Sequence, residues 1–328
     1  MMTLSTEAQF ALNAVRQMVR LVRKAQREFL LPELTKGDKS PVTVADFAGQ
    51  AFFGKLLSAT YPEDALVAEE KSDALQSPEA RPTLDKVVAV LKSVLGEVDP
   101  KDVCAWIDRG RSPARGRFWT LDPIDGTQGF LRGDQYVVAL ALIVNGQVEI
   151  SVLGCPLLNA QGETGKGGDG ALVLAVRGQG AWSSPLKEPL DLSPLHVSMC
   201  RAMRDATVLR SVQSNHIRLD KSNLFLSLAG AQKPPVPMDS LAKYFVVASG
   251  RGELFFYDAP ANRPALRMKI WDVAPGVLIV EEAGGRASDF AGRKIRFDSE
   301  DVVEMTGGLV VTNGLLHENA LDILRRVK

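Results

Sequence analysis

The segment that decides the interpretation of this chain reads Trp119-Thr120-Leu121-Asp122-Pro123-Ile124-Asp125-Gly126-Thr127. Its apolar first part predicts a β-strand that delivers two carboxylates, Asp122 and Asp125, onto a tight turn. Pro123 fixes its φ angle, and Gly126 permits conformations that are closed to other residues. Such a turn can aim both carboxylates, and the main-chain carbonyl of Ile124 between them, at one point. Oxygen ligands of this kind suit a hard cation, Mg²⁺ rather than Zn²⁺.

The end of the same segment allows two interpretations. If a helix begins at Gly126-Thr127, its free N–H groups face the same point and can hold a phosphate. The alternative is an Asp-rich turn in which the two carboxylates only cap that helix.

Other acidic residues also stand at the ends of apolar segments. Glu69-Glu70 follows a short strand predicted for residues 65–68, and two adjacent like charges at the end of a buried strand are costly unless a cation or solvent relieves them. Asp272 follows Ile270-Trp271 and opens a predicted helix, so it is either a metal ligand or a plain N-cap. Asp46 closes the pattern T-x-x-D and can be the acidic end of a capping box. Their shared placement favours a single carboxylate site.

The rest of the pattern predicts a layered α/β fold. The 328 residues exceed the size at which one core stops growing, and two domains are expected, 1–193 and 194–328. Apolar residues at helical spacing predict a helix over 5–30. Asn145-Gly146 between two apolar runs predicts a β-hairpin over 137–153. Because strands and helices mix without regular βαβ alternation, we expect stacked sheets and helices.

Composition excludes several classes of partner. Lys and Arg together number 39, as do Asp and Glu, so no basic field draws the chain to nucleic acid or an anionic membrane. The 3 Cys and 3 His are scattered, which argues against a disulfide framework or a zinc site. No apolar run reaches the roughly 20 residues of a membrane span, and no signal peptide is evident. We expect a cytoplasmic protein, with a monomer favoured.

Several motifs resemble the signatures of the lithium-sensitive, inositol-monophosphatase-like phosphatases. They are V-A-E-E at 67–70, D-P-I-D-G-T at 122–127 and W-D-V-A-P-G at 271–276. Within this family the chain resembles the 3′(2′),5′-bisphosphate nucleotidase branch, through S-P-V-T-V-A-D at 40–46, the run at 116–133, D-S-L-A-K-Y at 239–244 and K-I-W-D at 269–272. The resemblance implies an α/β/α/β/α sandwich with two sheets and a site between two domains.

The resemblance also implies roles for individual residues. The metal ligands, for two or three Mg²⁺ ions, would be Glu69, Asp122, Asp125, Asp272 and the carbonyl of Ile124. Asp46 and Thr127 would orient and deprotonate the attacking water. The residues near the substrate would be Gly126, Thr127, His216, Ser240, Lys243, Tyr257 and Asp272.

Substrate choice depends on residues late in the chain. Lys243 can pair with a 5′-phosphate, lie over a base, or be a solvated helix lysine. The family usually carries an arginine on the strand before K-I-W-D, where this chain has Tyr257. A tyrosine can stack on a base but provides no charge, and Arg263 or Arg267 could substitute for the arginine.

The predicted reaction is hydrolysis of the 3′-phosphate of 3′-phosphoadenosine 5′-phosphate, or of 3′-phosphoadenylyl sulfate. The alternatives are the same chemistry on an inositol phosphate and a non-catalytic sensor of metal and nucleotide.

Overall fold

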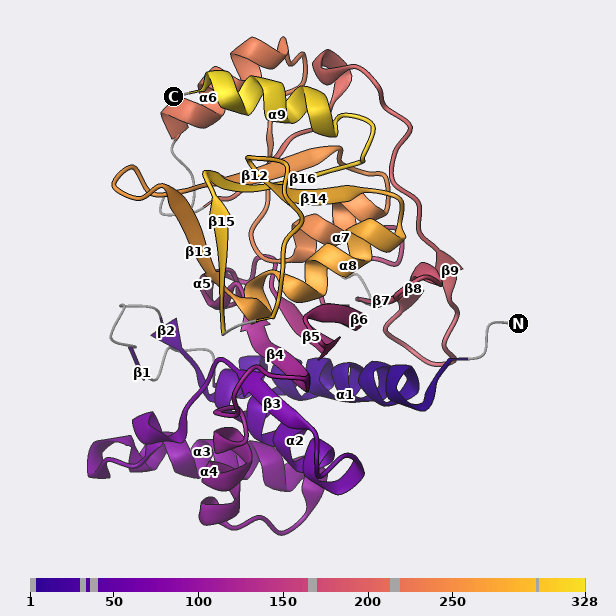
Figure 1. Ribbon diagram of the computed structural model, residues 1–328. Coiled ribbons are helices and arrows are strands. Elements are labelled where there is room, and N and C mark those ends of the chain that lie inside the picture. Colours follow the sequence, from indigo (N-terminus) through magenta and orange to yellow (C-terminus); the bar gives the residue numbers. More distant parts are fainter. Residues whose placement is uncertain are drawn as a thin grey trace.

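The computed structural model describes residues 4–29, 34–35, 41–164, 170–212, 219–298 and 301–327. Helices and sheets alternate in layers along the long direction of the molecule (Figure 1). The N-terminal helices lie on one side of a large sheet, and α7 and α8 separate that sheet from a smaller one, which α6 and α9 cover. The predicted α/β/α/β/α sandwich is confirmed.

The helices are α1 (Thr6–Glu28), α2 (Val44–Thr60), α3 (Arg81–Leu95), α4 (Pro100–Asp108), α5 (Thr127–Arg132), α6 (Leu219–Ala229), α7 (Ala242–Ala248), α8 (Ala274–Glu282) and α9 (His317–Arg326). The strands of the large sheet are β3 (Ala65–Ala68), β4 (Arg117–Asp125), β5 (Val137–Val144), β6 (Gln147–Cys155), β7 (Ala171–Val176), β8 (Gly180–Pro185) and β9 (Ser193–Pro194). The small sheet has β12 (Leu254–Asp258), β16 (Gly308–Thr312) and β14 (Arg286–Asp289), in that order. Two-stranded pairs are formed by β1 (Leu34–Thr35) with β2 (Pro41–Val42), β10 (Leu209–Arg210) with β11 (Val236–Pro237), and β13 (Ala265–Lys269) with β15 (Val302–Thr306).

Strand order in the large sheet follows the sequence from β3 to β9. β3 and β4 are parallel, and the later neighbours are antiparallel. Side chains alternate along β5: Val138 and Leu140 face the N-terminal helices, whereas Ala139 and Ala141 face α7 and α8. A strand buried on both faces reads as a continuous apolar run, as this one does.

Three apolar cores hold the layers together within the described residues. One joins α1–α4 to the large sheet, the second lies between the two sheets around α8, and the third lies between the small sheet, α6 and α9. The second core requires close approach of α7 and α8. At Gly276 a Cβ atom would lie 2.4 Å from the Tyr244 ring, so only glycine permits this distance.

Several predicted elements are confirmed, among them the first helix and the β5–β6 hairpin. Its turn residues Asn145 and Gly146 have φ of 50° and 76°, as a primed turn requires. One prediction was wrong in detail. The apolar strand was expected to end in a tight turn at Asp122, but β4 continues to Asp125. Late in the chain, the strand β10 is only Leu209–Arg210, and α9 buries one face in the third core.

The predicted domain boundary falls on β9, the last strand of the large sheet. The second core contains residues from both sides of it, such as Val173 and Val277. The division into 1–193 and 194–328 stays a prediction. Within the described residues, no helix has the length and apolar character needed to span a bilayer.

Candidate active site

The parallel pairing of β3 and β4 brings the first acidic residues together. Ala68 lies opposite Leu121 in this ladder, so Glu69 and Asp122 leave the same edge of the sheet. Carboxylate oxygens of Asp122, Asp125 and Asp272 lie within 4.8 Å of one another. Asp272 comes from the second half of the chain, at the end of a short 3₁₀ turn, Ile270–Asp272, before α8. The structure therefore gathers carboxylates that are 150 positions apart in sequence.

The stretch from Asp122 to Asp125 is an irregular end of β4, and not the tight turn that was predicted. The register between β4 and β5 shifts between these two positions, which lets both carboxylates face the site although they are three residues apart. An Asp122 carboxylate oxygen accepts a hydrogen bond from the Ile124 N–H at 2.9 Å. Gly126 has φ of 89°, a conformation that favours glycine. On the other side, Gly49 of α2 lets the helix approach Pro123, where a Cβ would lie 3.1 Å from the proline Cβ.

The capping interpretation fails for three of the acids. α5 begins at Thr127 after Gly126, with no side-chain cap. Asp125 instead accepts a hydrogen bond from the main-chain N–H of Leu241. The N-cap of α8 is Val273, also without a side-chain cap, so Asp272 is not the N-cap that was considered.

Burial and mutual repulsion dominate the electrostatics of these carboxylates. Burial raises the pKa of Asp122 well above its ordinary value, and the charges of Glu69, Asp125, Asp272 and Asp46 add to it. Burial, with the charges of Asp125 and Glu69, does the same to the pKa of Asp272. Burial raises the pKa of Asp125 to about 7, although the Leu241 N–H and Lys243 oppose the shift.

Like charges this close are costly unless a cation compensates them. An all-oxygen donor set on an ordered main chain suits Mg²⁺. The residues present therefore fit a divalent hard cation.

Asp46 lies at the start of α2, in a capping box with Thr43. The Thr43 N–H and hydroxyl donate to one Asp46 oxygen at 2.8 and 2.6 Å, and the Thr43 hydroxyl accepts from Ala45 at 3.1 Å. The capping box predicted from the T-x-x-D pattern is therefore present. Asp46 is also close enough to Asp122 for its charge to raise the pKa of that carboxyl. Thr127 donates its hydroxyl hydrogen to the Ile124 carbonyl at 3.2 Å, which leaves its lone pairs available.

Lys243 is not the solvated lysine that was one alternative. It is 1% exposed, and its ammonium donates to Ser211 Oγ at 3.1 Å and to the Met238 carbonyl at 3.0 Å. Its Nζ lies 5.2 Å from the centre of the Tyr257 ring. The buried ammonium thus links α7 to the segment before it and to β12, next to the carboxylates.

The remaining substrate candidates differ in placement. Ser240 lies against Gly126, since a Cβ on Gly126 would be 3.0 Å from the Ser240 Cβ, and it has a left-handed φ of 65°. His216 lies outside the described residues. Arg263 is exposed, and Arg267 is exposed and pairs with Glu304 at 3.9 Å.

Sequence reasoning missed two features that hold the 239–241 segment beside the carboxylates. Arg132 of α5 donates to Asp239 at 2.9 Å, and Asp239 also accepts from the Val212 N–H at 2.9 Å. Arg132 and Asp239 both lie within the motifs that resemble the family, so their opposite charges could have suggested this ion pair. The Leu241 N–H that donates to Asp125 is a main-chain group, so the identity of the residue could not predict this hydrogen bond.

A family model described as the inositol monophosphatase family matches residues 3–328. The chain belongs to the inositol monophosphatase family. The 3′(2′),5′-bisphosphate nucleotidase of Schizosaccharomyces pombe is 33% identical, over 98% of this chain and 95% of the relative. The 3′(2′),5′-bisphosphate nucleotidase 1 of Candida albicans is 34% identical, over 90% of this chain and 87% of the relative. The family predicted from the motifs is confirmed, and this member of it is a phosphatase.

Solved structures of the family share the fold. The Thermotoga maritima IMPase superposes with a TM-score of 0.66 at 20% identity, covering 98% of both chains. The inositol monophosphatase of Anabaena gives 0.63 at 19% identity, covering 98% of this chain and 96% of the other. One Arabidopsis thaliana relative, 33% identical, is named a putative mitochondrial bisphosphate nucleotidase, so a cytoplasmic location stays a prediction.

Proposed function

We propose that this phosphatase hydrolyses the 3′-phosphate of 3′-phosphoadenosine 5′-phosphate to give AMP and phosphate. We also propose that it converts 3′-phosphoadenylyl sulfate to adenylyl sulfate. The observation that carries the proposal is the nearly full-length identity of 33% and 34% to relatives with that nucleotidase name. Identity to the inositol monophosphatases of known structure is lower, 20% and 19%.

Glu69, Asp122, Asp125, Asp272 and the Ile124 carbonyl would hold the Mg²⁺ ions. Bound there, the ions would supply positive charge that screens the phosphate monoester and stabilises the leaving oxygen. The convergence of Asp122, Asp125 and Asp272 within 4.8 Å, with raised pKa values, supports this assignment. Glu69 joins them because its charge contributes to each of those shifts.

Asp46 and Thr127 would act on the attacking water. The Thr127 hydroxyl gives its hydrogen to the Ile124 carbonyl, so it can only accept a hydrogen bond from the water and thereby orient it. Asp46 would take the proton that the water loses as it attacks phosphorus. The Thr43 N–H and hydroxyl hold that carboxylate in place without neutralising it.

The segment 194–328 would close the substrate site over the metal ligands of the first segment. Ser240 lies against Gly126, so both can contact the phosphate. An ammonium has three donors, and Lys243 uses two of them on Ser211 and Met238. The third would serve the 5′-phosphate, with Tyr257 stacking on the base.

A phosphate-release assay over a substrate panel, with and without Mg²⁺, tests this function. We expect adenosine bisphosphate to be the preferred substrate, and activity to vanish in excess chelator. Preference for an inositol phosphate would replace the substrate assignment, in keeping with Tyr257 in place of the family's arginine. Nucleotide binding without turnover in Mg²⁺ would indicate a sensor.

A further inference from the structure

The loop after β3, which carries Glu69, is held by side chains from two helices, α2 and α4. Gln50 of α2 is fully buried and stands one helical turn after Asp46. Its Nε2 donates to the Glu70 carbonyl at 2.7 Å, and its Oε1 accepts from the Glu70 N–H at 2.8 Å. One side chain therefore binds both main-chain groups of the residue next to the predicted metal ligand.

The Gln50 amide is itself fixed in orientation. Its Nε2 also donates to the carbonyl of Ile107 in α4, at 2.8 Å. Space for the amide depends on Gly110, where a Cβ would lie 2.6 Å from Gln50 Nε2. Exchanging the amide oxygen and nitrogen would put donor against donor and acceptor against acceptors, so only one orientation is satisfied.

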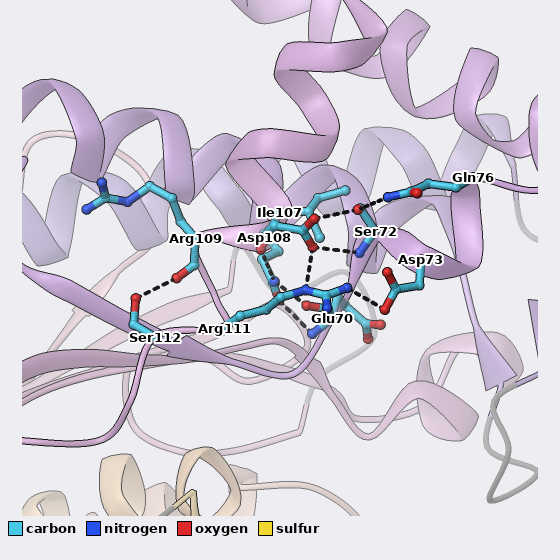
Figure 2. A network of polar contacts seen from close by, with 10 residues as sticks. Glu70, Ser72, Asp73, Gln76, Ile107, Asp108, Arg109, Arg111 and Ser112 are labelled. Atoms are coloured by element: carbon cyan, nitrogen blue, oxygen red, sulfur yellow. Dashed lines mark hydrogen bonds and ion pairs between the residues drawn. The ribbon is translucent and has the colours of Figure 1, made fainter.

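A second anchor follows two residues later. Both carboxylate oxygens of Asp108 bind Ser72, one accepting from its N–H at 3.0 Å and the other from its hydroxyl at 2.6 Å. Arg111 donates to the same carboxylate at 2.8 Å (Figure 2). Before the loop, the Ala68 N–H donates to the Gly110 carbonyl at 2.9 Å. Glu69 is thus bracketed by fixed main-chain positions on both sides.

We infer that Gln50 is a positioning residue for metal binding, which sets the main chain of the Glu69 loop before the ion arrives. The inference rests on the proposed function, because it takes Glu69 as a Mg²⁺ ligand. Groups that hold a ligand in place typically change metal affinity by about 10- to 100-fold when removed. Without this anchor, Mg²⁺ binding would also have to order the loop. The free-energy cost of that ordering would lower the affinity for Mg²⁺.

The test compares Gln50→Met with a matched buried amide outside the site. Asn313 is 1% exposed and also binds main-chain groups, donating to Ser198 and Cys200 at 3.1 and 2.8 Å and accepting from Leu316 at 3.1 Å. Mg²⁺ affinity is measured by isothermal titration calorimetry, and Tm in the absence of Mg²⁺. We expect both Gln50→Met and Asn313→Leu to lower Tm, and only Gln50→Met to weaken Mg²⁺ binding, by about 10-fold. Phosphatase activity of Gln50→Met should recover at high Mg²⁺.

Equal Mg²⁺ affinity in the two variants would overturn the inference while leaving the proposed function intact. A wild-type protein that binds no Mg²⁺ would overturn both.

Amide hydrogen exchange of the metal-free wild-type protein provides a second test that needs no variant. We expect the Glu70 amide to exchange slowly without Mg²⁺. Exchange as fast as in an unstructured loop, slowed only by Mg²⁺, would show that the ion orders the loop and Gln50 does not.

Discussion

Two buried clusters of polar side chains in this molecule differ in charge: one gathers several carboxylates, and the other surrounds a neutral histidine. The carboxylates of Asp122, Asp125 and Asp272 repel one another, and their pKa values are raised. Beside β16, His317 lies fully buried between the hydroxyls of Ser288 and Thr312, with its Nε2 at 2.8 Å from one and its Nδ1 at 3.1 Å from the other. Burial lowers the pKa of His317 to about 4, and the charge of Arg286 contributes.

The hydrogen bonds around His317 are complete with a neutral ring. The Ser288 hydroxyl donates to the Asp289 carbonyl at 2.7 Å, and the Thr312 hydroxyl oxygen accepts from Gly314 at 3.0 Å. A ring with its hydrogen on Nε2 then donates to Ser288 and accepts from Thr312. Burial of ionisable groups is therefore not enough to identify a functional site. The carboxylate site is distinguished by several mutually repelling charges that the surrounding protein offsets only in part.

The largest effect is expected from Asp46→Asn. The asparagine oxygen can still accept from Thr43, so α2 keeps its cap, but the side chain can no longer take a proton. We expect kcat to fall by roughly 10²–10⁴, the usual range for a lost general base, with Mg²⁺ affinity and Tm little changed. A nearly unchanged kcat would show that Asp46 serves only in the capping box of α2 and does not act as a base.

Asp122→Asn and Asp272→Asn should each weaken Mg²⁺ binding by at least about 10- to 100-fold. Mg²⁺ at 100 times its Kd should stabilise the wild-type protein by about 2.7 kcal/mol and these variants much less. Calorimetric titration and thermal melts give both values. Asp289→Asn is the matched control, because Asp289 is buried but accepts from Ala291 and Arg293. If all three variants lose stability and keep Mg²⁺ affinity, the acids have only structural roles.

Lys243→Met removes the buried ammonium while filling most of its volume. We expect kcat/KM for 3′-phosphoadenosine 5′-phosphate to fall about 10-fold, the lower end for a charge-assisted hydrogen bond. Hydrolysis of 3′-AMP, which lacks the 5′-phosphate, serves as the control and should change little. An equal loss on both substrates would assign Lys243 to holding Met238 and Ser211 in place.

The smallest effect is expected at His317, on stability alone. A folded-state pKa of about 4, below the ordinary 6.5, means that the unfolded chain binds the extra proton first as the pH falls. The contribution of the neutral ring is present above pH 6.5 and is lost as the pH falls through about 4. We expect His317→Gln to have a shallower decline of Tm over this range, with unchanged activity at pH 7.5. Parallel pH profiles of Tm for the wild-type protein and His317→Gln would contradict the contribution assigned to His317.

Much of the carboxylate site could be predicted because its parts are local. Pro123 and Gly126 restrict or free the main chain locally, and Asp122, Ile124 and Asp125 are close neighbours in sequence, so these three could be grouped from sequence alone. Glu69 and Asp272 followed from acids placed at the ends of apolar segments, supported by the family motifs. The burial of Lys243 could not be predicted, since the helix that carries it gives no sign of which face the adjoining segment covers.

By itself, the sequence determined the layered fold, the family and the residue types at the metal site, because apolar periodicity and turn chemistry act over a few neighbouring positions. The tertiary structure decided how these pieces meet. The parallel register of β3 and β4 aligns Glu69 with Asp122, and the packing of α8 brings in Asp272. The anchor that Gln50 makes to Glu70 joins residues 20 positions apart. These contacts depend on distances between layers, which are fixed only when the apolar cores close.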